Sequence, residues 1–167
     1  MSRKVKRVAL FGMLTALAFT LSYLESLLPI SLGIPGVKLG LANLVVVVAL
    51  WTLTPYEALA ISMIRVLLAG LTFGNGYSLL YSFAGALLSY AVMLLFKKSK
   101  LSVIGVSMLG GVCHNIGQIA VAAALVMRTA RIVYYLPVLL VAGLLTGLLI
   151  GIVAKAIADR IKQGGIS

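Results

Sequence analysis

The sequence is poor in residues that bind metals, form disulfides or carry acid–base chemistry. Its 167 residues include one cysteine, one histidine and three acidic residues. The single cysteine, Cys113, excludes an intrachain disulfide, and no Cys or His spacing typical of a metal site occurs. The acids Glu25, Glu57 and Asp159 lie far apart in the sequence, so there is no carboxylate cluster of the kind that holds Mg²⁺. We therefore predict neither a metal site nor a cofactor.

Motifs of several enzyme classes are also missing. The chain contains no phosphate-binding loop of the form G-x-x-x-x-G-K-[ST], no zinc-binding H-E-x-x-H and no nucleophile elbow G-x-S-x-G. We predict that the protein is not an enzyme. Because it also lacks an ATP site, any active transport would need an energising partner.

Charged residues are scarce and apolar residues are abundant. Charged residues make up 10% of the chain and hydrophobic residues 62%, whereas soluble domains are ~45–50% apolar. A soluble domain of this size buries only ~60–70% of the surface of its chain, so it could not hide this much apolar surface. We predict one all-α integral membrane domain spanning residues 1–167, in the cell membrane.

Six membrane-spanning helices are predicted, at residues 5–28, 38–53, 55–73, 77–96, 102–127 and 132–158. The second is short for a hydrocarbon core of ~30 Å, which would require a small tilt or a thinned bilayer. The third has a clear start, because Thr54, Pro55 and Glu57 match a capping box with proline at the first helical position. Glycine, proline and lysine runs separate the others.

The formal net charge of +11 is distributed as membrane topology requires. No basic stripe alternates with aromatic residues, which argues against nucleic-acid binding. Ten of the fourteen Lys and Arg residues lie at three places that flank apolar segments: Arg3, Lys4, Lys6 and Arg7; Lys97, Lys98 and Lys100; Lys155, Arg160 and Lys162. The positive-inside rule places these segments, and both termini, on the cytoplasmic side.

Two ionisable residues lie inside predicted spans. Arg65 is about 15 Å from the cytoplasmic start of its helix and His114 about 18 Å from the start of its own, at ~1.5 Å per residue. A charge inside a membrane costs at least ~2.5 kcal/mol, so such residues usually line a cavity or pathway. Asn43 lies near the outer end of the second span, and the inner half is nearly all aliphatic. This asymmetry predicts a pocket that opens outward.

The same polar residues also have structural interpretations. His114 and Gln118 are four residues apart and share a helix face, while Asn115 lies ~100° round the helix and could face a neighbouring helix. Hydrogen bonds between helices, worth ~0.6 kcal/mol on average, are the alternative to ligand contact for these three residues. Arg65 could belong to a buried structural pair. However, no acid is expected close to it, which favours an anionic ligand group.

Further candidates for substrate binding lie toward the outer ends of the spans: Lys38, Tyr81 and Tyr135. Tyr135 could equally belong to the aromatic belt at the membrane interface. A positive group indicates a carboxylate or phosphate ligand, and aromatic groups indicate a ring. The identity of the ligand stays open.

Small residues mark faces where helices approach closely. On the last span, Gly143, Gly147 and Gly151 form two overlapping G-x-x-x-G steps, for which we expect contacts within the molecule. On the first span, Ala9, Gly12 and Ala16 form a second small-residue face.

Five short motifs together resemble the Gx transporter family, whose members are often labelled heptaprenyl diphosphate synthase component I. They are PGVKLGLAN at 35–43, RVLLAG at 65–70, YSFAGA at 81–86, HNIGQ at 114–118 and YLP at 135–137. That family is similar to the substrate-binding S-components of energy-coupling factor transporters. The resemblance extends over residues 8–155. It implies a six-helix S-component-like bundle that binds a vitamin-like solute from outside.

The resemblance also implies partners: a transmembrane coupling subunit and two cytoplasmic ATPases. In S-components, small residues of the first helix contact the coupling subunit, and Ala9, Gly12 and Ala16 stand in that region here. The usual pattern is Ala-x-x-x-Ala, from which Met13 departs. The leading hypothesis is a substrate-binding subunit of a solute uptake transporter. The alternatives are a non-catalytic membrane component of prenyl diphosphate or quinone metabolism, and an autonomous permease.

Overall fold

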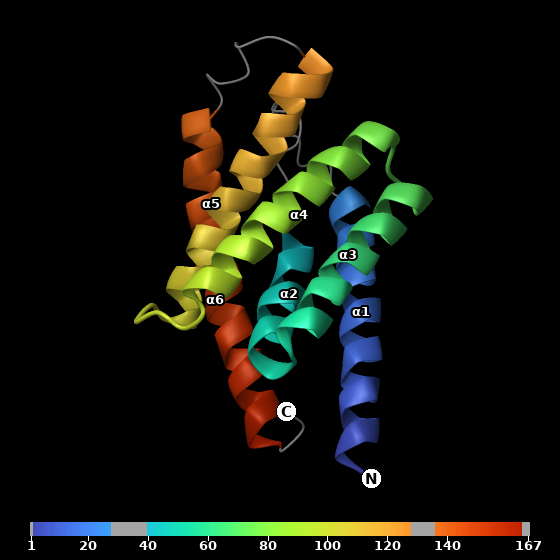
Figure 1. The fold of residues 1–167 in the computed structure, drawn as a ribbon, viewed down its shortest axis with the longest axis vertical. Coiled ribbons are helices and arrows are strands. Elements are labelled where there is room, and N and C mark those ends of the chain that lie inside the picture. Colours follow the sequence, from blue (N-terminus) through green and yellow to red (C-terminus); the bar gives the residue numbers. More distant parts are fainter. Residues whose placement is uncertain (1, 28–39, 128–135, 165–167) are drawn as a thin grey trace.

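The computed structural model describes residues 2–27, 40–127 and 136–164, which form a bundle of helices (Figure 1). The elements in chain order are α1 (Arg3–Leu27), α2 (Leu41–Thr52), α3 (Pro55–Thr72), α4 (Gly76–Phe96), α5 (Val103–Val121), the π-helical segment η1 (Ala122–Met127) and α6 (Leu136–Gln163). Five of these helices are long and apolar enough to cross a membrane. The all-helical membrane fold is therefore confirmed, although α6 continues past residue 158, where the sequence predicted its end.

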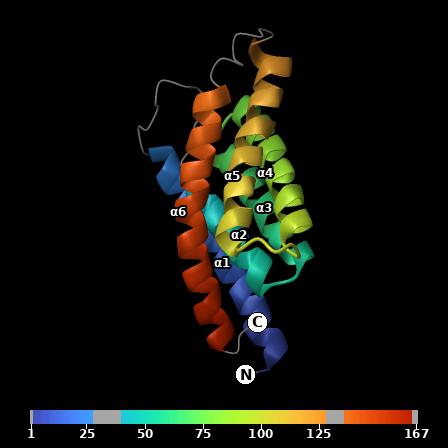
Figure 2. The same ribbon diagram turned by 90° about the vertical axis from the view of Figure 1, so that its left-hand side faces the viewer.

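Both chain ends lie at the same end of the bundle, and the turn between α3 and α4 lies at the opposite end (Figures 1 and 2). The basic residues of the termini and of the α4–α5 connection gather toward this shared end. There, burial and the nearby ammonium groups of Lys162 and Lys98 lower the pKa of Lys97. This basic end is the one that the positive-inside rule assigns to the cytoplasm.

The second predicted span, at residues 38–53, corresponds to the short helix α2, and residues 38 and 39 lie outside the described residues. Helix α2 has 12 residues and a length of about 18 Å at ~1.5 Å per residue, too short to cross ~30 Å of hydrocarbon. Eight of those residues are buried. A helix that is apolar all round belongs in a protein core, and α2 packs against α1, α3 and α6. The valine run at residues 45–48 is therefore core sequence and not a lipid-facing span.

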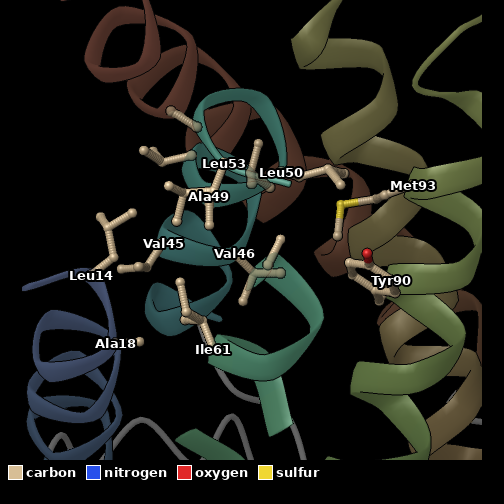
Figure 3. Close-up of a cluster of buried hydrophobic side chains, with 14 of the residues drawn as sticks. Leu14, Ala18, Val45, Val46, Ala49, Leu50, Leu53, Ile61, Tyr90 and Met93 are labelled. Atoms are coloured by element: carbon tan, nitrogen blue, oxygen red, sulfur yellow. The ribbon is translucent and has the colours of Figure 1, made fainter. Parts of the chain in front are cut away.

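Side chains of α2 form the centre of the apolar core (Figure 3). They meet residues of α1, α3 and α4, including Leu14, Ala18, Ile61, Tyr90 and Met93. Lipid tails are as apolar as these side chains, so the core is stabilised by close packing more than by removal from water. The core fills the half of the bundle nearest the termini. The aliphatic inner half of the predicted spans contributes to this core.

Helix α5 is held between α4 and α6 by close glycine contacts. A Cβ added to Gly111 would lie 2.3 Å from the carbonyl oxygen of Gly143, and one added to Gly147 would lie 2.7 Å from the Cα of Met108. On the α4 side, a Cβ on Gly117 would lie 2.8 Å from the carbonyl oxygen of Ala84. The expected intramolecular role of the glycine stripe on α6 is confirmed, and its partner is α5.

Polar contacts at the basic end connect three helices. The predicted capping box of α3 is present, with Thr54 and Glu57 bonded to each other's backbone N–H groups. The Glu57 carboxylate also accepts hydrogen bonds from Arg7 of α1, with Nη2 at 2.7 Å from Oε2. The hydroxyl of Tyr90 donates to the carbonyl oxygen of Pro55. The sequence predicted the cap but not the Arg7 contact, because residues 50 positions apart give no local signal.

Candidate functional site

Three neighbouring cavities lie between the α3–α4 turn and the interior of the bundle. The outer cavity, about 590 Å³ of empty space including its open mouth, is lined by Ser26, Ala69, Gly70, Phe73, Gly74, Asn75, Ser78 and Ser82. The middle cavity, about 420 Å³ by the same measure, is lined by Ser22, Glu25, Gly40, Asn43, Arg65, Val66, Ala69, Phe73, Ser82 and His114. The inner cavity, about 340 Å³, shares Gly40, Asn43 and His114 with it and lies among α2, α4, α5 and α6. The middle cavity also shares Ala69, Phe73 and Ser82 with the outer one, so the three cavities are neighbours.

The start of α2 brings a backbone terminus to the middle cavity. Gly40, the N-cap of α2, has φ +73°, a left-handed conformation that glycine adopts without steric cost. Its N–H donates to the carboxylate of Glu25 on α1. A carboxylate at a helix N-terminus is favoured because the helix dipole is positive there. This turn places Asn43 in the first turn of α2, facing the middle and inner cavities.

Arg65 of α3 is a buried cation in the wall of the middle cavity. Its side chain is 8% exposed, and its Nη2 lies 3.4 Å from Oδ1 of Asn43, a long hydrogen bond. Its Nε is buried and has no hydrogen-bond partner among the residues that the structure describes. The expectation that no acid lies nearby is wrong, because Glu25 lines the same cavity. The closeness of Glu25 and Arg65 was not predicted, because the depth of a residue along its own helix does not report how α1 lies relative to α3.

His114 of α5 lines the middle cavity opposite the α1–α3 side, and it also lines the inner cavity. Arg65 and His114 therefore share one cavity, a relation that the sequence left open. Gly85 of α4 makes this placement possible. A Cβ at Gly85 would lie 2.8 Å from the His114 carbonyl oxygen and 3.0 Å from ring atom Cε1.

Asn115 and Gln118 take part in contacts between helices to a greater extent than His114 does. Asn115 Nδ2 donates to the carbonyl oxygen of Leu139 on α6 at 2.6 Å, so the interhelical interpretation holds, although Asn115 also lines the inner cavity. Gln118 is buried against Gly85 and is not among the described residues that line the three cavities. Ligand binding by Asn115 and by Gln118 stays a prediction.

The candidates toward the outer ends of the spans are Tyr81, Lys38 and Tyr135. Tyr81 is half-buried and is not among the described lining residues, whereas its neighbour Ser82 lines both the outer and the middle cavity. Lys38 and Tyr135 lie outside the described residues.

Sequence reasoning missed Glu25, Ser82 and Phe73. Phe73 forms a wall shared by two cavities and packs against the ring of Phe19, with centroids 5.8 Å apart. Single serines and aromatics in apolar helices are too common to be informative without the fold. Glu25 carried a signal, because acids are rare in this chain.

The small-residue face of α1 is exposed on the outside of the bundle. Ala9, Gly12 and Ala16 are all exposed, and a Cβ added to Gly12 would meet no atom within 4 Å in the described structure. This face therefore differs from the glycine stripe of α6, which is covered by α5.

Comparison with known proteins gives one finding. The family model described as heptaprenyl diphosphate synthase component I matches residues 14–157. No curated protein and no solved structure matches the chain. The matched range contains five of the six helices almost completely and every described residue of the middle cavity. The chain is thus a multi-pass membrane protein that belongs to the heptaprenyl diphosphate synthase component I family.

Proposed function

We propose that the protein is the substrate-binding subunit of a solute uptake transporter in the cell membrane. The observation that carries this proposal is the buried Arg65, whose Nε lacks a partner in the described structure and whose cavity shares wall residues with the outer cavity. A buried, incompletely bonded cation is costly in a membrane. A ligand that supplies the missing acceptor would offset that cost when bound.

The position of the cavities supports capture from outside. The outer cavity lies at the α3–α4 turn, at the end of the bundle opposite the termini. If the basic end is cytoplasmic, this mouth faces outward. The aliphatic core around α2 closes the other half of the bundle, so release inward would require a rearrangement. We propose that a transmembrane coupling subunit and two cytoplasmic ATPases drive it, with Ala9, Gly12 and Ala16 as the docking face.

The family name favours a second candidate, a non-catalytic membrane component of a prenyl diphosphate synthase. Binding a diphosphate usually requires several cations or a metal held by clustered carboxylates. Among the described residues, no group of three or more His, Cys, Asp or Glu side chains could hold a metal ion. The described cavity is therefore better suited to the first function.

The test of the proposed function is purification of the native protein from its own membranes, followed by extraction and mass spectrometry. We expect one small molecule in near-stoichiometric amount, together with co-purifying ATPase subunits. Purified protein that holds no small molecule, and that supports prenyl synthase activity in a complex, would decide for the second candidate.

A Gly12→Leu variant tests the docking face separately. The leucine would project from the exposed face of α1 without meeting other parts of the described bundle, so the melting temperature should stay unchanged. Capture of the ATPase-bearing complex should fall at least about tenfold, because close helix approach needs small residues. Leu149→Phe, at an α6 residue that is 64% exposed, is the matched control and should not affect capture. Equal capture by both variants would rule out this face.

A further inference from the structure

We propose that the ligand is a small monocarboxylate, not a phosphate ester or a diphosphate, and that it binds with its carboxylate directed inward against Arg65. This inference rests on the proposed function, because it names the chemical class that the same site accepts. The size, the charge and the hydrogen-bonding geometry of the described cavities support it independently.

The sizes of the cavities define which part of a ligand goes where. The middle cavity has free room for about two or three water-sized groups, enough for the head of a small acid but not for a diphosphate. The outer cavity is much roomier. A ligand with its anionic group at Arg65 would therefore place its body among Ser26, Ser78, Ser82 and Asn75, against the ring of Phe73. That lining suits a compact body with hydroxyl groups or one ring, and not a long prenyl chain.

The charge balance favours a single negative charge. The described lining of the middle cavity holds one cation, Arg65, and one acid, Glu25. Glu25 is bonded to the N–H of Gly40 at the start of α2, so its charge is already placed at the positive end of a helix dipole. A ligand with one carboxylate adds one negative charge to this cation and acid. The second charge of a phosphate ester, or the further charges of a diphosphate, would lie beside Glu25 in a medium of low dielectric constant.

The geometry of Arg65 matches a carboxylate. A guanidinium binds carboxylates, and also phosphates, through two parallel N–H groups, so the choice between them rests on size and charge. On Arg65 the Nε is without a partner in the described structure, and the adjacent Nη2 makes only the 3.4 Å contact with Asn43. The edge formed by Nε and Nη2 is thus available for two bonds. The amide of Asn43 lines the same cavity and can donate to a ligand oxygen.

The experiment measures stabilisation of the purified protein by acids, by their uncharged amides and by phosphate compounds. The probes are benzoate, benzamide and phenyl phosphate; lactate and lactamide; and geranyl diphosphate, each at about 10 mM, with the melting temperature as readout. At least one monocarboxylate should raise the melting temperature of the native protein, its amide should bind at least about tenfold more weakly, and Arg65→Gln should abolish the shift. Asn43→Ala, which keeps the cation, should weaken the same carboxylate about 10-fold and serves if Arg65→Gln does not fold.

Every outcome bears on the proposal. Stabilisation by phenyl phosphate or geranyl diphosphate that exceeds that by the carboxylates would overturn it, as would equal binding of acid and amide. If no probe binds, the molecule extracted from native membranes decides: a monocarboxylate supports the inference, and a retained molecule without a carboxylate overturns it while the proposed function stands. If neither a probe nor an extracted molecule is found, the proposed function itself fails.

Discussion

Replacing Arg65 with methionine should abolish ligand binding and, at the same time, make the ligand-free protein more stable. A buried cation with an incomplete set of hydrogen bonds is costly inside a membrane, and an apolar side chain of similar volume removes that cost. Arg65 is 8% exposed and incompletely bonded in the described structure. Removing the partner of a buried charged ligand group typically costs ~2–5 kcal/mol, so affinity should fall by about 30-fold or more.

The two effects are measured on one preparation, by thermal unfolding without ligand and by equilibrium binding of the molecule that co-purifies. Leu67→Met, at a lipid-facing position of the same helix that is 45% exposed, is the control and should change neither. A loss of more than about 2 kcal/mol of stability in Arg65→Met would show that Arg65 is mainly a structural partner of Asn43 and Glu25. If Arg65 serves binding and not folding, the substitution should raise the free energy of unfolding and lower the ligand affinity.

The second large effect is expected on replacing Gly111, a residue of α5 that lines the inner cavity. An alanine Cβ there would lie 2.3 Å from a backbone oxygen of Gly143, so the α5 and α6 backbones would have to separate. We expect Gly111→Ala to lower the free energy of unfolding by about 3 kcal/mol or more, in the upper range for overpacking. Gly111→Leu should give no folded protein.

The matched control is on the same helix. A Cβ at Gly105 would meet its nearest atoms at 3.7 Å or more, an ordinary contact. Gly105→Ala should therefore stabilise the protein by about 0.4–1 kcal/mol, because alanine restricts the unfolded chain. Both variants are compared by denaturant titration in the same detergent. Similar stabilities for the two would contradict the close α5–α6 approach.

Much of the fold was predictable because the membrane imposes simple rules on a sequence. Apolar length, basic flanks and the Thr54–Glu57 cap gave helix number, the shared end of both termini and the start of α3. The shortness of the second span was predicted, but its burial against α1, α3 and α6 was not. Hydropathy alone does not distinguish a helix in lipid from a helix in a protein core.

The site was predictable in part, for a related reason. The cost of charge in lipid identified Arg65 and His114, and Asn43 followed from its depth. Glu25 was placed too far from Arg65, because distance between helices depends on tilt and packing. Ser82 was missed in favour of Tyr81, since a difference of one residue turns a side chain by ~100° and only the packing of α4 on α5 fixes that angle.

The glycine contacts of α5 have a mechanical consequence. Backbones in direct contact leave little freedom to slide, so we expect α4, α5 and α6 to move together as one slab. The middle cavity lies along the seam between this slab, which carries His114, and the group of α1 to α3, which carries Glu25 and Arg65. A molecule that contacted both His114 and the side of Glu25 and Arg65 would hold the two groups of helices at a fixed separation. Binding would then affect the placement of α1, the helix whose exposed face carries Gly12.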